Sequence, residues 1–472
     1  MKTIVIDPVT RIEGHSKITL HLNDDGEVEN AYFHVTQFRG FEKLSEGRPF
    51  YEMPSLMARI CGICPVSHLI ASAKACDALL AVQIPHAGSK LRRIMNLAQV
   101  IQSHALSFFY LSSPDLLLGM DADPSQRNIY GVAKARPDLA RGGIRLRQFG
   151  QQVIELLGGK RIHPGWIVPG GVSEPLTAEK RDEILKGLPE AMDIAQRTLA
   201  WFKFILPRYQ EEIRAFANFP TLFMGTVNEE GAMKLYDGKV RVVDANRQIV
   251  HPGFEASQYA DYIGEAVEDF TYLKSPYYKP AGYPDGIYRV GPLARMMVSD
   301  RISTHHAQAE FEEFHKMDAW QLQSSFHMHY ARLIEIMYCI ERIEESLRDP
   351  DILNPRVRAY AEPNSLEGVG MSEAPRGTLI HHYKIDDNGL ITWANLVIAT
   401  GHNNLAMNRG VLQVAQHFVK GNALQEGMLN RVEAVIRAYD PCLSCSTHAV
   451  GQMPLKIELH APDGQILDTV AR

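Results

Sequence analysis

Two pairs of cysteines carry the strongest chemical signal in this sequence. Cys61 and Cys64 lie in the stretch RICGICPVSH, and Cys442 and Cys445 lie in DPCLSCSTH near the C-terminus. A C-x-x-C spacing on a turn directs both thiolates to one point, and two such pairs can surround one metal centre although they are far apart in the chain. The two pairs are therefore candidate ligands of one shared metal site.

Spacing alone leaves other kinds of cysteine site open. A structural zinc site with four thiolates has the same pattern, although such sites usually stabilise small modules rather than a chain this apolar. A disulfide is disfavoured, because we see no signal peptide before RIEGH and expect a reducing compartment. A thioredoxin-like dithiol would explain one pair but not two. Cys76 and Cys339 lie in apolar helical patterns and are predicted to be inert core thiols.

The composition excludes several classes of protein. The chain has 472 residues, of which 45% are apolar and 22% charged, and its formal net charge is −6. It has no run of lysine or arginine, so neither nucleic acid nor an anionic membrane surface is an expected partner. No apolar run approaches the roughly 20 residues that a membrane-spanning helix needs. We expect a cytoplasmic protein with a large buried core.

The spacing of apolar residues predicts an α+β fold that is predominantly α. Long helices with three- and four-residue apolar spacing are expected to form a central bundle core, and small antiparallel β-rich regions are expected at the N- and C-terminal ends. Without repeats or polar linkers, one compact core is the simplest arrangement. Strands or hairpins are predicted over 2–6, 16–23, 28–35, 239–252 and 455–470, and helices over 85–109, 145–159, 183–206, 320–347 and 424–439.

Further motifs accompany the cysteines. RIEGH covers residues 11–15, RGFE covers 39–42 and EAPRGTLIHHY covers 373–383. Together with the two C-x-x-C pairs, these motifs resemble the large, catalytic subunit of nickel-iron hydrogenases from end to end. The stretches HYKIDDNG, ATGHNNLAMN and AVGQMPL are most similar to the cytosolic, bidirectional, NAD-linked type. The related complex I subunit shares the fold but lacks the four cysteines.

The resemblance implies an oxidoreductase that interconverts H2 with protons and electrons. It implies that Cys61 and Cys442 are terminal nickel ligands, whereas Cys64 and Cys445 bridge nickel to an iron ion that carries carbonyl and cyanide ligands. Thiolates are soft donors with spare lone pairs, which suits both nickel and a bridge to a second metal.

The same resemblance assigns proton transfer to two residues. The Cys442 thiolate is expected to accept the proton first, and Glu13 of RIEGH is expected to carry it onward. A carboxyl group in a dry site is a suitable proton relay. Without the resemblance, Glu13 would be an ordinary exposed carboxylate at a strand end.

A second group of residues is expected to hold the site. Arg376 of EAPRG matches the family arginine that lies over the two metals, and Asp115 and Asp440 are expected to orient it through ion pairs. Thr400 falls where the family places a hydroxyl that donates to cyanide. Without the resemblance, Arg376 would be a surface or salt-bridge arginine and Asp440 a simple helix cap.

A magnesium site is also implied. Glu42 of RGFE and His448 of DPCLSCSTH match ligands of a structural magnesium ion, and the backbone carbonyl of Leu396 and water would complete the set. His448 would equally fit as a third ligand in a mixed zinc site.

The other candidate histidines are not assigned as metal ligands. His68, just past Cys64, is expected to donate a hydrogen bond to a thiolate sulfur. The histidine pairs at 305–306 and 381–382 receive no role, because neighbouring side chains on a helix point in different directions.

The resemblance also predicts the limits of the mature chain. Residues 1–448 would form a single catalytic domain, and residues 449–472 would be a C-terminal extension. In the family this extension is removed just after the histidine of DPCxxCxxH, once nickel is in place. A maturation endopeptidase and nickel-insertion proteins are therefore expected partners.

Electron transfer requires further subunits. Outside the four thiols only Cys76 and Cys339 remain, so an iron-sulfur small subunit must carry the proximal cluster. No G-x-G-x-x-G follows a predicted strand, so NAD or NADP and a flavin are expected on separate diaphorase subunits. Two other functions stay open, namely a non-catalytic four-cysteine zinc scaffold and a hydrogen-sensing regulatory relative.

Overall fold

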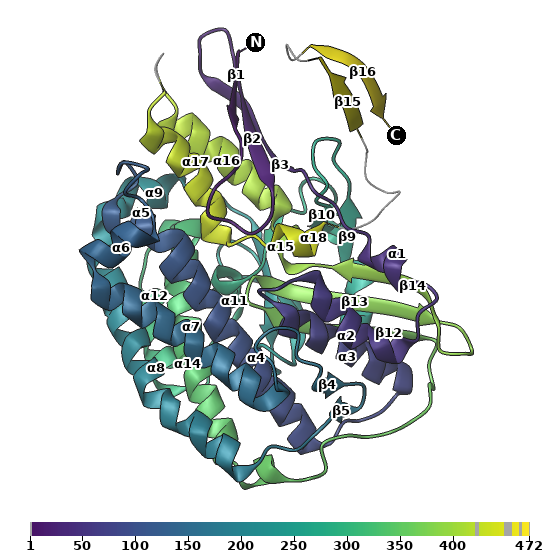
Figure 1. The fold of residues 1–472 in the computed structure, drawn as a ribbon. Coiled ribbons are helices and arrows are strands. Elements are labelled where there is room, and N and C mark those ends of the chain that lie inside the picture. Colours follow the sequence, from purple (N-terminus) through teal and green to yellow (C-terminus); the bar gives the residue numbers. More distant parts are fainter. Residues whose placement is uncertain (1, 421–423, 448–455, 462–464, 472) are drawn as a thin grey trace.

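Long helices form the body of the protein (Figure 1). The computed structural model describes residues 2–420, 424–447, 456–461 and 465–471. Within it, α4 packs against α7 and α14, and α8 packs against the same two helices. Apolar side chains at three- and four-residue spacing, such as Leu91, Ile94 and Met95 of α4, are fully buried in this bundle. The bounds are α4 His86–Leu106, α7 Pro137–Gly158, α8 Ala178–Ile205 and α14 Met328–Arg348.

A three-stranded antiparallel sheet, β12-β13-β14, lies beside the bundle, and α3 packs against β12 and β13. This sheet was not among the strands predicted from the sequence. Its middle strand is buried on both faces along most of its length, so it lacks the alternation of apolar and polar residues that reveals a half-exposed strand. The bounds are α3 Pro65–Leu80, β12 Glu367–Ala374, β13 Gly377–Ile385 and β14 Ile391–Val397.

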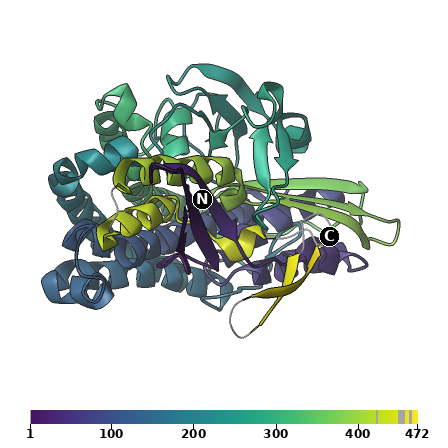
Figure 2. The same cartoon turned by 90° about the horizontal axis from the view of Figure 1, so that it is seen from above.

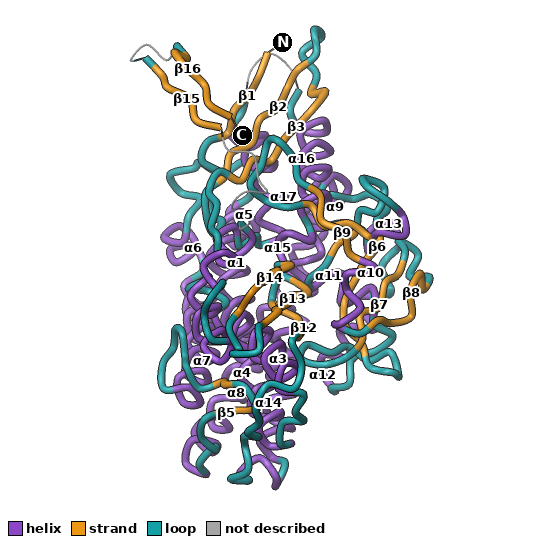
Figure 3. Tube along the Cα trace, turned by 90° about the vertical axis from the view of Figure 1, so that its right-hand side faces the viewer, coloured by secondary structure: helices purple, strands orange, loops and turns teal. Residues whose placement is uncertain are grey.

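The predicted β-rich ends are present. The N-terminal strands β1, β2 and β3 form an antiparallel meander, in which burial alternates along β2 and α16 packs against β3. The last two strands, β15 and β16, form an antiparallel hairpin that projects from the helical body (Figures 2 and 3). The bounds are β1 Lys2–Ile6, β2 Ser16–Leu22, β3 Val28–Val35, α16 Asn404–Phe418, β15 Lys456–His460 and β16 Ile466–Ala471.

A second, four-stranded sheet has the order β11-β6-β7-β8. Its strands β7 and β8 are the hairpin predicted over 239–252. Two further pairs of strands, β4 with β5 and β9 with β10, are short. The bounds are β4 Ile167–Val168, β5 Gly171–Val172, β6 Leu222–Val227, β7 Lys239–Val243, β8 Ile249–Phe254, β9 Ile263–Ala266, β10 Ser275–Tyr278 and β11 Tyr288–Arg289.

The remaining α-helices pack around these parts or connect them. Those next to the cysteines are α1 Phe41–Ser45, α2 Met53–Met57, α15 Ala399–His402, α17 Glu426–Tyr439 and α18 Leu443–Ser446. The others are α5 Ser113–Leu118, α6 Ile129–Ala135, α9 Gln210–Ala215, α10 Tyr259–Tyr262, α11 Pro292–Val298, α12 His305–Phe314 and α13 Ala319–Leu322.

The arrangement confirms the predicted α+β class with a helical core. Among the described residues, no helix has both the length and the apolar character needed to cross a membrane. The main apolar core fills the bundle. A smaller apolar cluster between α3 and the sheet β12-β13-β14 contains the four cysteines of the two C-x-x-C motifs. The sheet therefore helps to exclude water from the site.

Candidate metal centre

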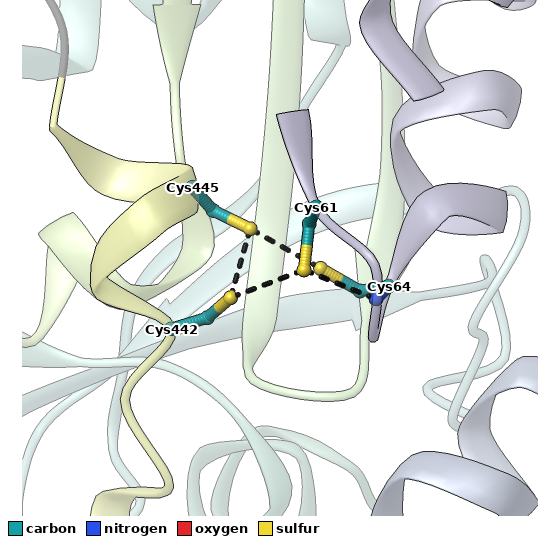
Figure 4. Close-up of side chains that lie close together, drawn as sticks. All are labelled: Cys61, Cys64, Cys442 and Cys445. Carbon is teal, nitrogen blue, oxygen red and sulfur yellow. Dashed lines mark hydrogen bonds between the residues drawn. The ribbon is translucent and has the colours of Figure 1, made fainter. Parts of the chain in front are cut away.

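The two C-x-x-C pairs meet at one point (Figure 4). The Sγ atoms of Cys61 and Cys442 lie 3.4 Å apart, those of Cys64 and Cys445 lie 3.3 Å apart, and those of Cys442 and Cys445 lie 2.9 Å apart. All four side chains are free thiols and are buried. Four soft sulfur donors in a water-excluded cluster are suited to a transition metal.

Local backbone structure places each thiol. Cys61 is extended after a short 3-10 turn, and its sulfur accepts hydrogen bonds from the N–H groups of Ile63 and Cys64 at 3.2 and 3.3 Å. Cys64 precedes α3, which begins with a proline at its first position. At the other pair, Asp440 ends α17 in the left-handed region, with φ 55°, and so turns the chain into Cys442.

The charge state of the thiols explains why a cation would be bound. Hydrogen bonds from the thiols of Cys442, Cys445 and Cys64 hold the pKa of Cys61 well below its usual value, although burial opposes ionisation. Conversely, the Cys442 thiol donates hydrogen bonds to the neighbouring cysteine sulfurs, and this donation together with burial raises the pKa of Cys442 well above its usual value. The cluster by itself thus favours a single thiolate. A divalent metal supplies the positive charge that further thiolates need, so the residues fit such an ion.

Arg376 lies in the turn between β12 and β13 and is buried beside the thiols. Its Nε donates to the Asp440 carbonyl oxygen at 2.5 Å, its Nη2 to Asp440 Oδ1 at 3.1 Å and its Nη1 to Ser103 Oγ at 3.2 Å. Burial opposes its charge, but Asp440 and three of the four cysteines raise the pKa of Arg376 well above its usual value. A permanently charged guanidinium therefore faces the cluster.

Asp115 does not pair with Arg376, which corrects the expectation from sequence. Its carboxylate accepts from Arg11 Nη2 at 2.6 Å, from Arg437 Nη1 at 2.7 Å and from Asn430 Nδ2 at 3.1 Å. Asp115 stands at the start of α5, and its buried charge is satisfied by the N-terminal loop and by α17. Asp440 alone of the two aspartates holds Arg376.

Glu13 lies against the second cysteine pair and is not a free surface carboxylate. Its carbonyl oxygen accepts the N–H of Leu443 at 3.2 Å, and its carboxylate accepts the N–H of Ser444 at 3.0 Å and the Ser444 hydroxyl. The approach is close because Gly14 has no side chain; a Cβ there would lie 2.6 Å from Leu443 Cβ. Ser444 gave no signal in the sequence, because a serine between two cysteines has no distinctive pattern.

Thr400, at the start of α15, contacts the second pair directly. Its hydroxyl oxygen accepts the backbone N–H of Cys442 at 2.9 Å. A hydroxyl that accepts one hydrogen bond can also donate one, and the Thr400 side chain is buried.

His68 makes a different contact from the expected one. Its Nδ1 lies 3.1 Å from His381 Nε2, whose ring is in turn 2.6 Å from the Tyr383 hydroxyl through Nδ1, and that hydroxyl donates to Ser72 Oγ at 2.9 Å. Among the described contacts of His68 no hydrogen bond reaches sulfur. Burial lowers the pKa of His68 to about 4, so the ring is neutral and serves as part of a buried polar chain. His381, which received no role from sequence, belongs to this chain.

Two of the three predicted magnesium ligands lie in the described part of the chain. Glu42 lies on α1, Leu396 lies on β14, and these two elements pack against each other. The Leu396 carbonyl is on a strand that is buried at this point. His448 lies outside the described residues.

A second possible ligand group lies at the surface. Ligand atoms of His305, His306 and Glu341 come within 4.8 Å of one another. Glu341, however, already accepts the N–H groups of His306 and Ala307 at 2.7 and 3.1 Å. The carboxylate thus acts as a cap for α12.

Known proteins resemble this chain along its whole length. A family model described as nickel-dependent hydrogenase matches residues 39–128 and 224–448, and one described as HoxL-like matches residues 3–38. The chain is 43% identical to the beta subunit of the NAD-reducing hydrogenase HoxS of Cupriavidus necator, over 100% of both chains. It is 42% identical to one subunit of the F420-non-reducing hydrogenase vhc of Methanococcus voltae, over 98% of each chain.

A solved structure shows the same fold. The structure of an NAD+-reducing [NiFe]-hydrogenase in the H2-reduced state matches with a TM-score of 0.92 and 45% identity. The match covers 95% of this chain and 100% of the solved chain.

Proposed function

Because this chain belongs to the nickel-dependent hydrogenase family of oxidoreductases, we propose that it is the catalytic subunit of an NAD-linked hydrogenase in the cytoplasm. It would interconvert H2 with protons and electrons at a thiolate-bridged nickel-iron centre. The observation that carries this proposal is the convergence of four buried thiols within 4.8 Å of one another, beside a charged arginine.

The proposal assigns a task to each residue of the site. The metals would be held by the four thiols Cys61, Cys64, Cys442 and Cys445, of which Cys64 and Cys445 would be the ligands shared by nickel and iron. When bound, such a centre with carbonyl and cyanide on iron supplies the Lewis acidity and electron storage for heterolytic cleavage of H2. Arg376 would direct its guanidinium at the substrate position, which its two hydrogen bonds to Asp440 support.

Proton movement is assigned to Glu13 and the second cysteine pair. The Cys442 sulfur takes up the proton, and the Glu13 carboxylate passes it on. Support comes from the contacts of Glu13 with Leu443 and Ser444, which place the carboxylate along the turn that carries Cys442. The Thr400 hydroxyl, which already accepts from Cys442 N–H, is proposed to donate to a cyanide nitrogen.

Two further features complete the proposal. Glu42, the Leu396 carbonyl and His448 would bind magnesium, a hard cation that prefers oxygen ligands. Electrons would leave through an iron-sulfur small subunit to diaphorase subunits that carry flavin and NAD. Support comes from the cysteine count: outside the centre, the chain has only Cys76 and Cys339, which are single and buried.

The proposed function is tested on the purified complex by infrared spectroscopy, metal analysis and H2-dependent reduction of NAD. We expect bands in the region of carbonyl and cyanide stretches that shift under H2, and nickel and iron in the sample. Zinc in place of nickel, with no such bands, would overturn the proposal in favour of a zinc scaffold. Reduction of an artificial dye but not of NAD would remove only the link to NAD.

We further propose that residues 449–472 are removed during maturation. Two observations support this. The match to the nickel-dependent hydrogenase family model ends at residue 448. The solved NAD+-reducing hydrogenase chain aligns over its whole length with only 95% of this chain, whereas the full HoxS beta subunit aligns with 100% of it. Intact-mass measurement of active enzyme is expected to give a chain that ends at His448. Active, nickel-containing enzyme that retains the β15-β16 hairpin would contradict this.

A further inference from the structure

A fully buried arginine on α11 uses every N–H group of its guanidinium. Arg295 donates from Nε and Nη2 to the two Glu335 oxygens at 2.6 and 2.7 Å, and from Nη1 to Glu373 Oε2 at 2.8 Å. It also donates to the carbonyl oxygens of Ala374 and Pro375, at 3.1 and 3.0 Å. These five bonds match the five donors of a guanidinium, so no simpler cation could replace them all.

The two carbonyls belong to the turn that carries Arg376. Ala374 pairs with Gly377 across the β12-β13 hairpin, which leaves Pro375 and Arg376 at the tip. The start of α11 also contacts the tip, because Gly291 has φ 95° and a Cβ there would lie 2.8 Å from the Arg376 carbonyl oxygen. The first turn of α11 thus contacts the backbone of the tip at Ala374, Pro375 and Arg376.

The carboxylates that hold Arg295 are themselves fixed by other elements. His104 Nε2, on α4, lies 2.7 Å from Glu335 Oε2, and the Thr378 hydroxyl, on β13, donates to Glu373 Oε1 at 2.8 Å. Burial opposes the charge of Glu335, but Arg295 and His104 lower its pKa to about 2. Arg295 therefore connects the turn rigidly to α4, α14 and β12.

We propose that Arg295 is a positioning residue that sets the place of the Arg376 guanidinium over the metal centre, by holding the two carbonyls that precede Arg376. This inference rests on the proposed function. Arg376 has a long side chain, so a small shift of its backbone moves the guanidinium away from Asp440 and the thiols. A misplacement of about 1 Å in an active site can cost about a hundredfold in rate.

The test is Arg295→Lys, whose ammonium has three donors instead of five and cannot bridge two carboxylates and two carbonyls. We expect kcat for H2 oxidation to fall by about tenfold or more, with the KM for H2 little changed and the nickel content retained. The carbonyl and cyanide infrared bands are expected to shift, because the charge of Arg376 has moved relative to the iron ligands.

Arg92→Lys is the matched control. Arg92 is also fully buried; it pairs with Asp77 at 2.5 Å and donates to the carbonyls of Val168 and Gly171 at 2.6 and 2.9 Å. That network holds β4 and β5, and its described hydrogen bonds do not involve Cys61, Cys64, Cys442, Cys445 or Arg376. We expect a similar loss of stability but unchanged kcat and unchanged infrared bands.

A crystal structure of the Arg295→Lys complex gives a readout that needs no activity. We expect the Nη2 of Arg376 to have left its position 3.1 Å from Asp440 Oδ1. An unmoved Arg376, or a kcat equal to that of Arg92→Lys, would overturn the positioning role. If Arg295→Lys fails to fold, Glu335→Gln removes one charge of the anchor and is expected to lower kcat in the same direction; an unchanged kcat would overturn the proposal. An inactive wild-type complex would instead overturn the proposed function alone.

Discussion

Replacing Cys445 with alanine is expected to abolish both nickel retention and hydrogen turnover. Its sulfur lies 2.9 Å from that of Cys442 and 3.3 Å from that of Cys64, so it contacts a sulfur of each pair. Without Cys445, nickel would lose one of its four sulfur donors, and Cys64 would be the one proposed bridging sulfur that remains, so nickel and iron would no longer be held together. Nickel and iron analysis of the purified variant, together with H2-dependent dye reduction, measures the effect.

Cys339→Ala is the matched control for this prediction. Cys339 is a fully buried thiol in α14, and burial raises its pKa well above the usual value, so it stays a neutral core group. Its replacement is expected to cost about 1 kcal/mol of stability and to leave metal content and turnover unchanged. Loss of nickel from Cys339→Ala but not from Cys445→Ala would contradict the assignment of the centre.

Replacing Glu13 with glutamine is expected to lower hydrogen turnover by about 10²- to 10⁴-fold, because a positioned proton relay contributes rates of that order. Glutamine has the same shape as glutamate. Its oxygen can accept the N–H of Ser444 and its amide can donate to the Ser444 hydroxyl, so both contacts of Glu13 are retained without a transferable proton. Nickel content and the infrared bands are expected to be unchanged. Hydrogen uptake and isotope exchange between D2 and water measure the loss.

Glu433→Gln tests whether loss of any carboxylate near the N-terminal segment that carries Glu13 has the same effect. Glu433 accepts the N–H and the hydroxyl of Thr10 at 2.6 and 2.9 Å, which is the same kind of contact three residues before Glu13. It has no described contact with a cysteine. We expect stability to fall, since Arg437 loses a charged partner at 3.0 Å, while turnover is maintained. Equal losses of turnover in the two variants would refute the relay role of Glu13.

The helices of the bundle were predictable, whereas one important sheet was not. A helix such as α4 buries apolar residues at a spacing that is visible in the sequence. The strand β13 is buried along eight of its nine residues and contains two histidines and a threonine, so its pattern resembles neither an alternating strand nor an amphipathic helix. Its neighbours β12, β14 and α3 make it a strand, and these contacts are tertiary.

The residues of the site divide in the same way. Cys61, Cys64, Cys442 and Cys445 could be named from spacing, because metal-ligand chemistry restricts both residue type and separation. The partners in an ion pair have no comparable spacing in the sequence. The expected partner of Arg376 was correct for Asp440 and wrong for Asp115, because any buried carboxylate can be satisfied by whichever arginine the fold brings near.

By itself the sequence determined the donor chemistry, the helical core and the family resemblance, since these depend on residue types at short or regular spacing. Only the tertiary structure decided which groups orient the reactive ones. Ser444 beneath Glu13, Ser103 beside Arg376 and Arg295 behind the Arg376 turn come from segments far apart in the chain. Their roles depend on distances of about 3 Å between atoms, and hydrogen bonds over such distances are set by packing rather than by local sequence.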